Sequence, residues 1–173
     1  MTRDSQRSAV YRWGWTLYRA YPALDEVLTK DEILALVRRI FREYGKRAPT
    51  VIFANGDHRA WAKGNAFWNR ITLPVAHEWA RKRGIVLHEA AHCLTDDKHG
   101  PRYARMFLDL MVRYAGVPAA KARSIGVHQK PRRVRFAKAN EVRQRKSAAW
   151  IRWHDKLLGL QAAVQEHKKR EPA

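Results

Sequence analysis

The sequence predicts an α+β fold in which a small antiparallel sheet packs against several helices. Two observations support this class. Apolar residues recur at helical spacing before and after a middle segment, whereas that middle segment holds two short runs rich in β-formers. The chain has 173 residues, 46% of them apolar, which is enough for one hydrophobic core and an appendage. We therefore expect one main domain.

Two helices are expected before the strands. The first spans residues 7–20, is rich in aromatic residues and ends before Pro22. The second begins with a capping-box pattern, Thr29 followed by Glu32, and is expected to end at Gly45. Its apolar residues lie at helical spacing and predict one buried face: Ile33, Leu36, Val37, Ile40, Phe41 and Tyr44.

Two strands should follow. Residues 50–54 and 66–73 are β-rich, and the turn residues 55–57 (Asn-Gly-Asp) lie between them. We interpret these runs as strands of a small antiparallel sheet. Pro74 is placed to open the next helix, with Gly84 as a potential break.

A further helix should start at Pro101 and end at Gly116, followed by a short helical piece after Pro118. A long basic helical pattern then covers residues 137–169. We divide the chain into a domain at 1–120 and a basic helical extension at 121–173, which holds 15 basic and 4 acidic residues. The extension carries an apolar stripe that either packs on the domain or a second copy, or binds a partner: Trp150, Trp153, Leu157, Leu160 and Val164.

The chemistry is concentrated in the stretch VLHEAAHCLTDDKHGPRY. His88 and His92 stand four residues apart, so on a helix both imidazoles point the same way and can share one metal ion. Glu89 lies about 60° from His92 around the helix axis and can face the metal without ligating it. A similar stretch, His77-Glu78-Trp-Ala-Arg81, ends in an arginine, which is not a ligand. Only the second copy is complete.

A catalytic zinc site normally takes three protein ligands, so a third is needed. His99 is the best candidate, because residues 95–98 form a polar turn that would fold it back over His92. Asp96 and Asp97 in that turn and Asp109 on the following helix are the alternatives. Cys93 is interpreted as a small buried residue, with a redox-sensitive thiol or a ligand as the other readings.

The residues ITLP, VLHEAAHCL and HGPRY together resemble the SprT-like (Spartan-type) zinc metallopeptidases, over about half of the chain. The resemblance implies a zincin-like core, zinc at His88, His92 and His99, and Glu89 as the catalytic acid/base. Tyr103 stands where that family has an aromatic residue, and we expect it to pack rather than react. The spacing from His92 to His99 is short compared with several members, and the single cysteine rules out the zinc ribbon that many of them carry.

In such an enzyme, Glu89 would act as general base on a zinc-activated water that hydrolyses a peptide bond. The run at residues 66–73 is expected to be the edge strand along which an extended substrate lies. No oxyanion stabiliser is identified, although His58, Arg102 and Tyr103 are candidates.

The charge of the chain points to a polyanion. Its net charge is +19, with 35 Lys and Arg against 16 Asp and Glu. We expect binding of DNA or RNA by charge and shape, because no sequence-reading motif is present. The candidate contact residues are Lys130, Arg132, Arg133, Arg135, Arg143, Arg145 and Lys146.

These patterns predict a cytoplasmic, nucleic-acid-associated zinc endopeptidase that acts on proteins, including DNA-bound ones as the resemblance implies. Neither a signal-peptide pattern nor an apolar run of membrane-spanning length is seen, and one cysteine suits a reducing compartment. One alternative is a non-catalytic nucleic-acid- or ribonucleoprotein-binding protein with a structural or vestigial zincin core. Another is a zincin hydrolase that acts on a small or non-protein substrate.

Overall fold

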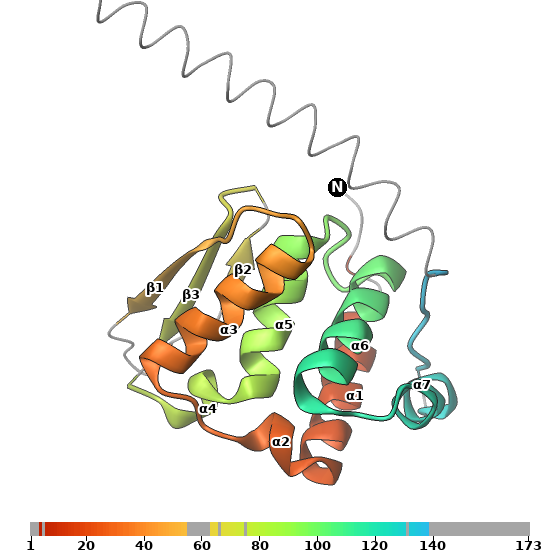
Figure 1. Cartoon of the computed structure of the whole chain (residues 1–173). Helices are drawn as coiled ribbons and strands as arrows, with labels where there is room; N and C mark the ends of the chain where they lie inside the picture. The colour runs from red at the N-terminus through yellow and green to blue at the C-terminus, as the bar shows by residue number, and fades with distance from the viewer. Residues whose placement is uncertain are drawn as a thin grey trace, which may run out of the picture. The chain divides into compact units, whose positions relative to one another are not determined.

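A computed structural model describes residues 4, 6–54, 63–65, 67–74, 76–130 and 132–138. The chain divides into two compact units, the first ending at Ala137 and the second starting at Lys138. The expected turn at 55–57 lies outside the described residues, as does the long helical pattern at 137–169 beyond residue 138. The described part is α+β, as predicted, and its fold is that of the first unit (Figure 1).

The helices predicted before the sheet are confirmed. Helix α1 (Arg7–Ala20) ends two residues before Pro22, which opens the short helix α2 (Pro22–Asp25). Helix α3 (Lys30–Glu43) starts with the expected capping box. The Thr29 hydroxyl accepts from the Glu32 N–H, and the Thr29 N–H donates to the Glu32 carboxylate over 2.7 Å. The backbone N–H groups of Thr29 and Glu32 therefore both have acceptors.

The sheet is mixed rather than antiparallel, which corrects the prediction. It contains β1 (Thr50–Ala54), β2 (Lys63–Asn65) and β3 (Arg70–Pro74) in the order β1-β3-β2. Strand β1 pairs with β3 in parallel, and β2 pairs with β3 in antiparallel. The sequence pattern missed β2, because a three-residue strand with a central glycine gives no β-rich run. Without β2, the two β-rich runs joined by a turn signal predict antiparallel neighbours, whereas β1 and β3 pair in parallel.

The position of the second predicted strand also differs. Residues 67–69 form a turn, so β3 starts only at Arg70, and it lies in the centre of the sheet instead of at an edge. The edge strand that contacts the histidine-bearing helix is β2. The edge strand expected near the histidines is therefore β2 and not residues 66–73.

After the sheet come α4 (Glu78–Arg81) and α5 (Arg83–Leu94). Pro74 is the last residue of β3 and not the start of a helix, and the chain breaks at the extended Lys82 rather than at Gly84. Gly84 lies inside α5, where an added Cβ would overlap the ring of Tyr18. The glycine thus allows α5 to approach α1 closely.

Helix α6 (Pro101–Ala115) begins and ends as predicted, with Gly116 in the left-handed region at φ 65°. Helix α7 (Ala119–His128) follows. In Figure 1, α5 runs between the sheet on one side and α6 on the other, with α1 and α7 beyond. The apolar residues predicted for α6 are all buried: Met106, Phe107, Leu110, Met111 and Tyr114.

Residues 119–137 belong to the first unit and pack on its other helices, whereas the predicted boundary places residues 121–137 in the extension. The Trp13 indole N–H donates to the Ala122 carbonyl over 2.8 Å, and the Trp13 ring meets Phe136 edge-on. The side chain of Gln6 exchanges two hydrogen bonds with the backbone of Arg135. These contacts explain why the first unit runs through residue 137.

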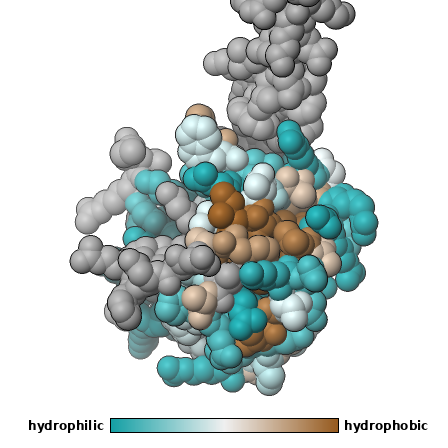
Figure 2. Space-filling model, turned by 90° about the vertical axis from the view of Figure 1, so that its left-hand side faces the viewer, coloured by the Kyte–Doolittle hydropathy of each residue, from teal (hydrophilic) through white to brown (hydrophobic). Residues whose placement is uncertain are grey.

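The surface seen from the side of β1 has an apolar area in its middle, with hydrophilic residues to its right and below it (Figure 2). Ile52 of β1 is one of the exposed large apolar side chains of the described chain. Among the described helices, none combines the length with the apolar character that a membrane crossing needs.

Candidate metal centre

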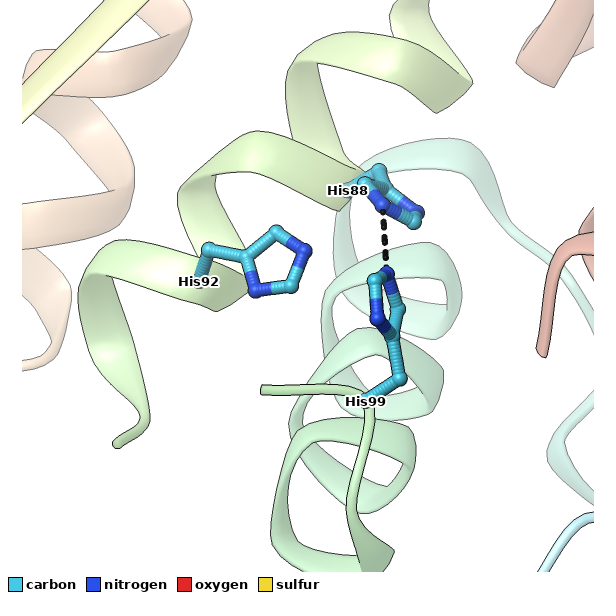
Figure 3. A group of neighbouring side chains, drawn as sticks. All are labelled: His88, His92 and His99. Atoms are coloured by element: carbon cyan, nitrogen blue, oxygen red, sulfur yellow. Dashed lines mark hydrogen bonds between the residues drawn. The ribbon is translucent and has the colours of Figure 1, made fainter. Parts of the chain in front are cut away.

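Helix α5 carries the first two histidines of the site. His88 and His92 are four residues apart, and Figure 3 shows both rings projecting from the same side of the helix. Small Ala90 and Ala91 between them are fully buried. The helix is therefore enclosed by protein, and His88 keeps only 5% of its surface exposed. Burial on this scale excludes bulk water from one side of the rings.

The turn between α5 and α6 brings in His99. The Asp97 carboxylate accepts from the backbone N–H groups of Arg102 and Tyr103, at 2.8 and 2.9 Å, and so holds the turn against the start of α6. Lys98 adopts a left-handed conformation at φ 52°, and an added Cβ at Gly100 would overlap the Asp97 side chain. These features bend the chain tightly enough to point His99 back at α5 (Figure 3).

The three histidines form a group whose ligand atoms all lie within 4.8 Å of one another. The Nε2 atoms of His88 and His99 are 3.3 Å apart. Two nitrogens bound to one tetrahedral zinc ion at about 2.0–2.1 Å would be separated by about 3.3 Å. The observed spacing thus matches that of two ligands on one metal ion, and the group could bind such an ion.

The alternative ligands have other partners. Asp96 pairs with Arg102 at 2.6 Å, and Asp109 pairs with Arg105 at 3.2 Å. The Asp97 carboxylate accepts hydrogen bonds from the backbone N–H groups of Arg102 and Tyr103. Cys93 is buried, and its thiol donates to the Arg70 carbonyl. Within the described ranges, the group that could hold a metal ion consists of the three histidines.

Electrostatics keeps the three imidazoles neutral, which is the form that binds metals. Burial, followed by the neighbouring imidazoles, lowers the pKa of His88 well below its usual value. Burial, together with His99 and Arg7, lowers the pKa of His92 to about 3. Burial also lowers the pKa of His99, although the carboxylate of Asp4 opposes this. All three rings therefore present a lone pair near neutral pH.

Glu89 directly follows His88 on α5, and its carboxylate is held by the sheet. Its Oε2 accepts a hydrogen bond from the backbone N–H of Gly64 in β2. Burial raises the pKa of Glu89 to about 7, against the opposing effect of that hydrogen bond. An added Cβ at Gly64 would overlap the Glu89 carbonyl oxygen and lie 2.9 Å from the His92 Cβ. Only glycine lets β2 approach α5 this closely.

Two residues near the triad were missed by sequence reasoning. Oδ2 of Asp4 lies 2.8 Å from Nδ1 of His99, and the Tyr11 ring lies 5.2 Å from His88 and 5.1 Å from His99. Neither gives a local sequence pattern, because Asp4 is 95 residues from its partner. Gly64 was also missed, although an isolated glycine in a strand can mark a close backbone approach.

Tyr103 packs, in agreement with its expected role. Its ring is fully buried against all three histidines, and its hydroxyl donates to the His88 carbonyl over 3.3 Å. Arg102 is engaged with Asp96, and His58 lies outside the described residues. Tyr11 is 38% exposed, so it lies at the surface of the site, whereas Tyr103 is buried.

Comparison of the chain with protein-family models, with curated proteins and with solved structures gives no match. The functional assignment therefore depends on the chain's own residues. Their clearest feature is the group of three histidines that could bind a metal ion.

The predicted nucleic-acid contacts are only partly described. Lys130, Arg132, Arg133 and Arg135 follow α7, and all four are exposed. Their backbone is anchored, since Arg12 donates to the Lys130 carbonyl over 2.8 Å. The remaining candidates lie outside the described residues: Arg143, Arg145 and Lys146.

Proposed function

We propose that this protein is a zinc-dependent endopeptidase of the SprT-like type that acts in association with nucleic acid. One observation carries the proposal: the ligand atoms of three neutral imidazoles lie within 4.8 Å of one another, and the helix that carries two of them also carries a buried carboxylate, Glu89. Three histidines can hold a catalytic zinc ion, and a glutamate can serve as the general base of zinc-dependent hydrolysis.

The donor set suits zinc. Imidazole nitrogen is a favoured zinc ligand, and three protein ligands leave a fourth position for water or substrate. Bound at His88, His92 and His99, zinc would supply a Lewis acid that acidifies water and polarises a peptide carbonyl. The Asp4 carboxylate at Nδ1 of His99 fixes the ring so that Nε2 faces the other histidines.

Glu89 is the proton carrier in this proposal. Its Oε2 is occupied by the Gly64 N–H, so Oε1 accepts the proton of the attacking water and returns it to the leaving amine. A pKa near 7 allows the carboxyl group to take up and release a proton at neutral pH. Positive charge beside the carboxylate would favour its ionised form, which is the one needed to accept the proton.

The substrate is an extended polypeptide that lies along β2. This strand is at the edge of the sheet, runs antiparallel to β3 and touches the Glu89 carboxylate through Gly64. Main-chain pairing with an edge strand accepts many sequences, because it reads the backbone and not the side chains. We therefore expect weak sequence selectivity.

Nucleic acid is the partner that the charge of the chain suits. The net charge is +19, and the basic side chains Lys130, Arg132, Arg133 and Arg135 are exposed. The resemblance implies that the protein substrates are themselves DNA-bound. If about six phosphates are contacted, affinity should fall roughly a thousandfold from about 50 to about 200 mM salt.

The test compares Glu89→Gln with wild type, measuring zinc content and cleavage of DNA-bound proteins. Wild type should carry one zinc ion per chain, and the variant should keep its zinc while losing cleavage. Glu78→Gln is the matched control, since Glu78 belongs to the incomplete copy of the motif and lies at the start of α4. A folded wild-type protein that takes up no zinc would rule the proposal out.

The second candidate is a non-catalytic nucleic-acid- or ribonucleoprotein-binding protein with a vestigial metal site. The observation that favours it is the net charge of +19, which exceeds what peptide hydrolysis requires. It predicts that Glu89→Gln behaves like wild type in every assay, whereas removal of the chain after Ala137 abolishes function. The two candidates therefore differ in the outcome of a single substitution.

A further inference from the structure

The turn between β2 and β3 presents two large aromatic side chains to solvent. Phe67 is 69% exposed and Trp68 is 66% exposed, the highest values among the large hydrophobic residues that the structure describes. Their rings meet edge to face, with centroids 4.8 Å apart. Exposed aromatic rings contribute none of the stabilisation that burial of apolar surface gives. Two adjacent exposed rings therefore suggest a binding role rather than a role in folding.

The backbone of this turn is fixed on both sides. The Asn65 side-chain oxygen accepts from the backbone N–H groups of Phe67 and Trp68, at 3.0 and 3.1 Å. The Asn69 amide donates to the carbonyls of Arg47 and Ala48, and Asn69 itself has a left-handed φ of 43°. The two rings are thus projected from an ordered platform, which reduces the entropy lost when a partner binds.

The surroundings of the turn are basic. Residues 46–51 and 63–74 meet there, through the bonds from Asn69 and the pairing of Thr50 with Arg70. The two segments contain four basic residues and no acidic one. The side chains of Arg47 and Arg70 are exposed. An anionic partner with flat apolar groups would match both the charge and the rings.

We propose that the Phe67–Trp68 turn is a base-stacking site for single-stranded nucleic acid, with Arg47 and Arg70 contacting the flanking phosphates. Bases in a duplex are stacked on one another, whereas those of a single strand can stack on exposed aromatic rings. The site is separate from the basic stretch at residues 130–135 and requires neither a metal ion nor peptidase activity.

The Phe67–Trp68 turn lies close to the strand that contacts Glu89. Phe67 follows Gly64 by three residues, so their Cα atoms are at most about 11 Å apart. A strand stacked on the turn would therefore pass close to β2 and Glu89. This consequence rests on the proposed function: a protein attached to that strand would be held next to the catalytic carboxylate.

The experiment measures binding of a fluorescein-labelled oligothymidine and of a hairpin duplex to the full-length protein at low salt. Phe67→Ala/Trp68→Ala should weaken oligothymidine binding about fivefold to a hundredfold, the range expected from losing one stacked base. Duplex binding should change by less. Trp15→Ala is the control, because Trp15 is 52% exposed but lies on α1, and it should bind both ligands like wild type.

A second readout reports stacking directly. Oligothymidine should quench the tryptophan fluorescence of wild type, and Trp68→Phe should lose most of that quenching while retaining most of the affinity. Wild-type affinity in the double variant would overturn the proposal, as would equal losses for oligothymidine and duplex. Both assays are run in the Glu89→Gln background, so an absence of peptidase activity does not affect the outcome.

Discussion

Oδ2 of Asp4 lies 2.8 Å from Nδ1 of His99, while Nε2 of the same ring faces His88 at 3.3 Å. Asp4, three residues before the start of α1, therefore orients the third histidine of the site, which is only 6% exposed. Gln6, at the start of α1, is itself hydrogen-bonded through its side chain to the backbone of Arg135. The candidate metal centre thus involves a residue before α1 as well as the histidine-bearing helix.

Replacing Asp4 should weaken metal binding without unfolding the protein. Partners that orient a ligating histidine typically contribute 10- to 100-fold to metal affinity, so Asp4→Ala should lose about that much. Asp4→Asn keeps an oxygen acceptor and should lose less. Competition with a chromophoric chelator measures the affinity. Asp25→Asn is the control, since Asp25 pairs with Lys82 and not with the triad; an equal effect there would contradict the role of Asp4.

Gly64→Ala should destabilise the protein and displace Glu89. The added Cβ would overlap the backbone of α5, and overpacking of this kind costs about 1–3 kcal/mol of unfolding free energy. Gly14→Ala is the matched control. An added Cβ at Gly14 in α1 would lie 3.6 Å from its nearest atom, and alanine favours helix by about 0.5–1 kcal/mol. Urea unfolding of both variants tests the contrast, and equal stabilities would show that β2 can move away from α5.

Tyr103→Phe should leave cleavage and zinc content close to wild type. The ring is buried among the three histidines, and its hydroxyl donates to the His88 carbonyl rather than facing the point where the imidazoles converge. Removal of that hydrogen bond should lower the free energy of unfolding by about 1 kcal/mol. Tyr103→Ala, which removes the ring, should cost about 3–5 kcal/mol. A large loss of cleavage in the stable phenylalanine variant would instead assign the hydroxyl a chemical role.

Trp13→Phe should destabilise the first unit by breaking the link between α1 and α7. The Trp13 indole is fully buried and donates to the Ala122 carbonyl over 2.8 Å. Phenylalanine removes this hydrogen bond and leaves part of the indole volume unfilled, at a cost of about 1–3 kcal/mol. The same substitution at the exposed Trp15 should change stability by less than about 0.5 kcal/mol. Denaturant unfolding distinguishes the two, and similar values would show that α7 contributes little.

The features that sequence predicted well are local ones. The start of α3 depends on Thr29 and Glu32, three residues apart, and the pairing of His88 with His92 needs only helical periodicity. His99 could be proposed because a turn of fixed length separates it from α5. In each case the relevant interactions lie within about a dozen residues along the chain, where pattern and propensity determine geometry.

The features that sequence did not predict depend on distant contacts. Thr50 pairs in parallel with Arg70, 20 positions away, and β3 lies between β1 and β2. Such pairing depends on context more than on the propensities of the strand residues. Asp4 and Gly64 act on residues 95 and 25 positions away. A short strand such as KGN has no alternating pattern, so nothing in it predicted the edge that contacts Glu89.

Zinc should raise the thermal stability of wild type but not of a protein that lacks the third histidine. A ligand at about 100 times its dissociation constant stabilises the folded state by about 2.7 kcal/mol, which corresponds to roughly 5–10 °C in a domain of this size. His99→Ala should lose most of this shift, because two ligands hold the ion more weakly than three.

His77→Ala is the control for zinc binding, since His77 belongs to the incomplete motif before α4 and is not part of the histidine group. Melting curves recorded with excess zinc and with a chelator measure the difference. A full zinc-dependent shift in His99→Ala would mean that the turn at residues 95–98 brings no ligand to the metal.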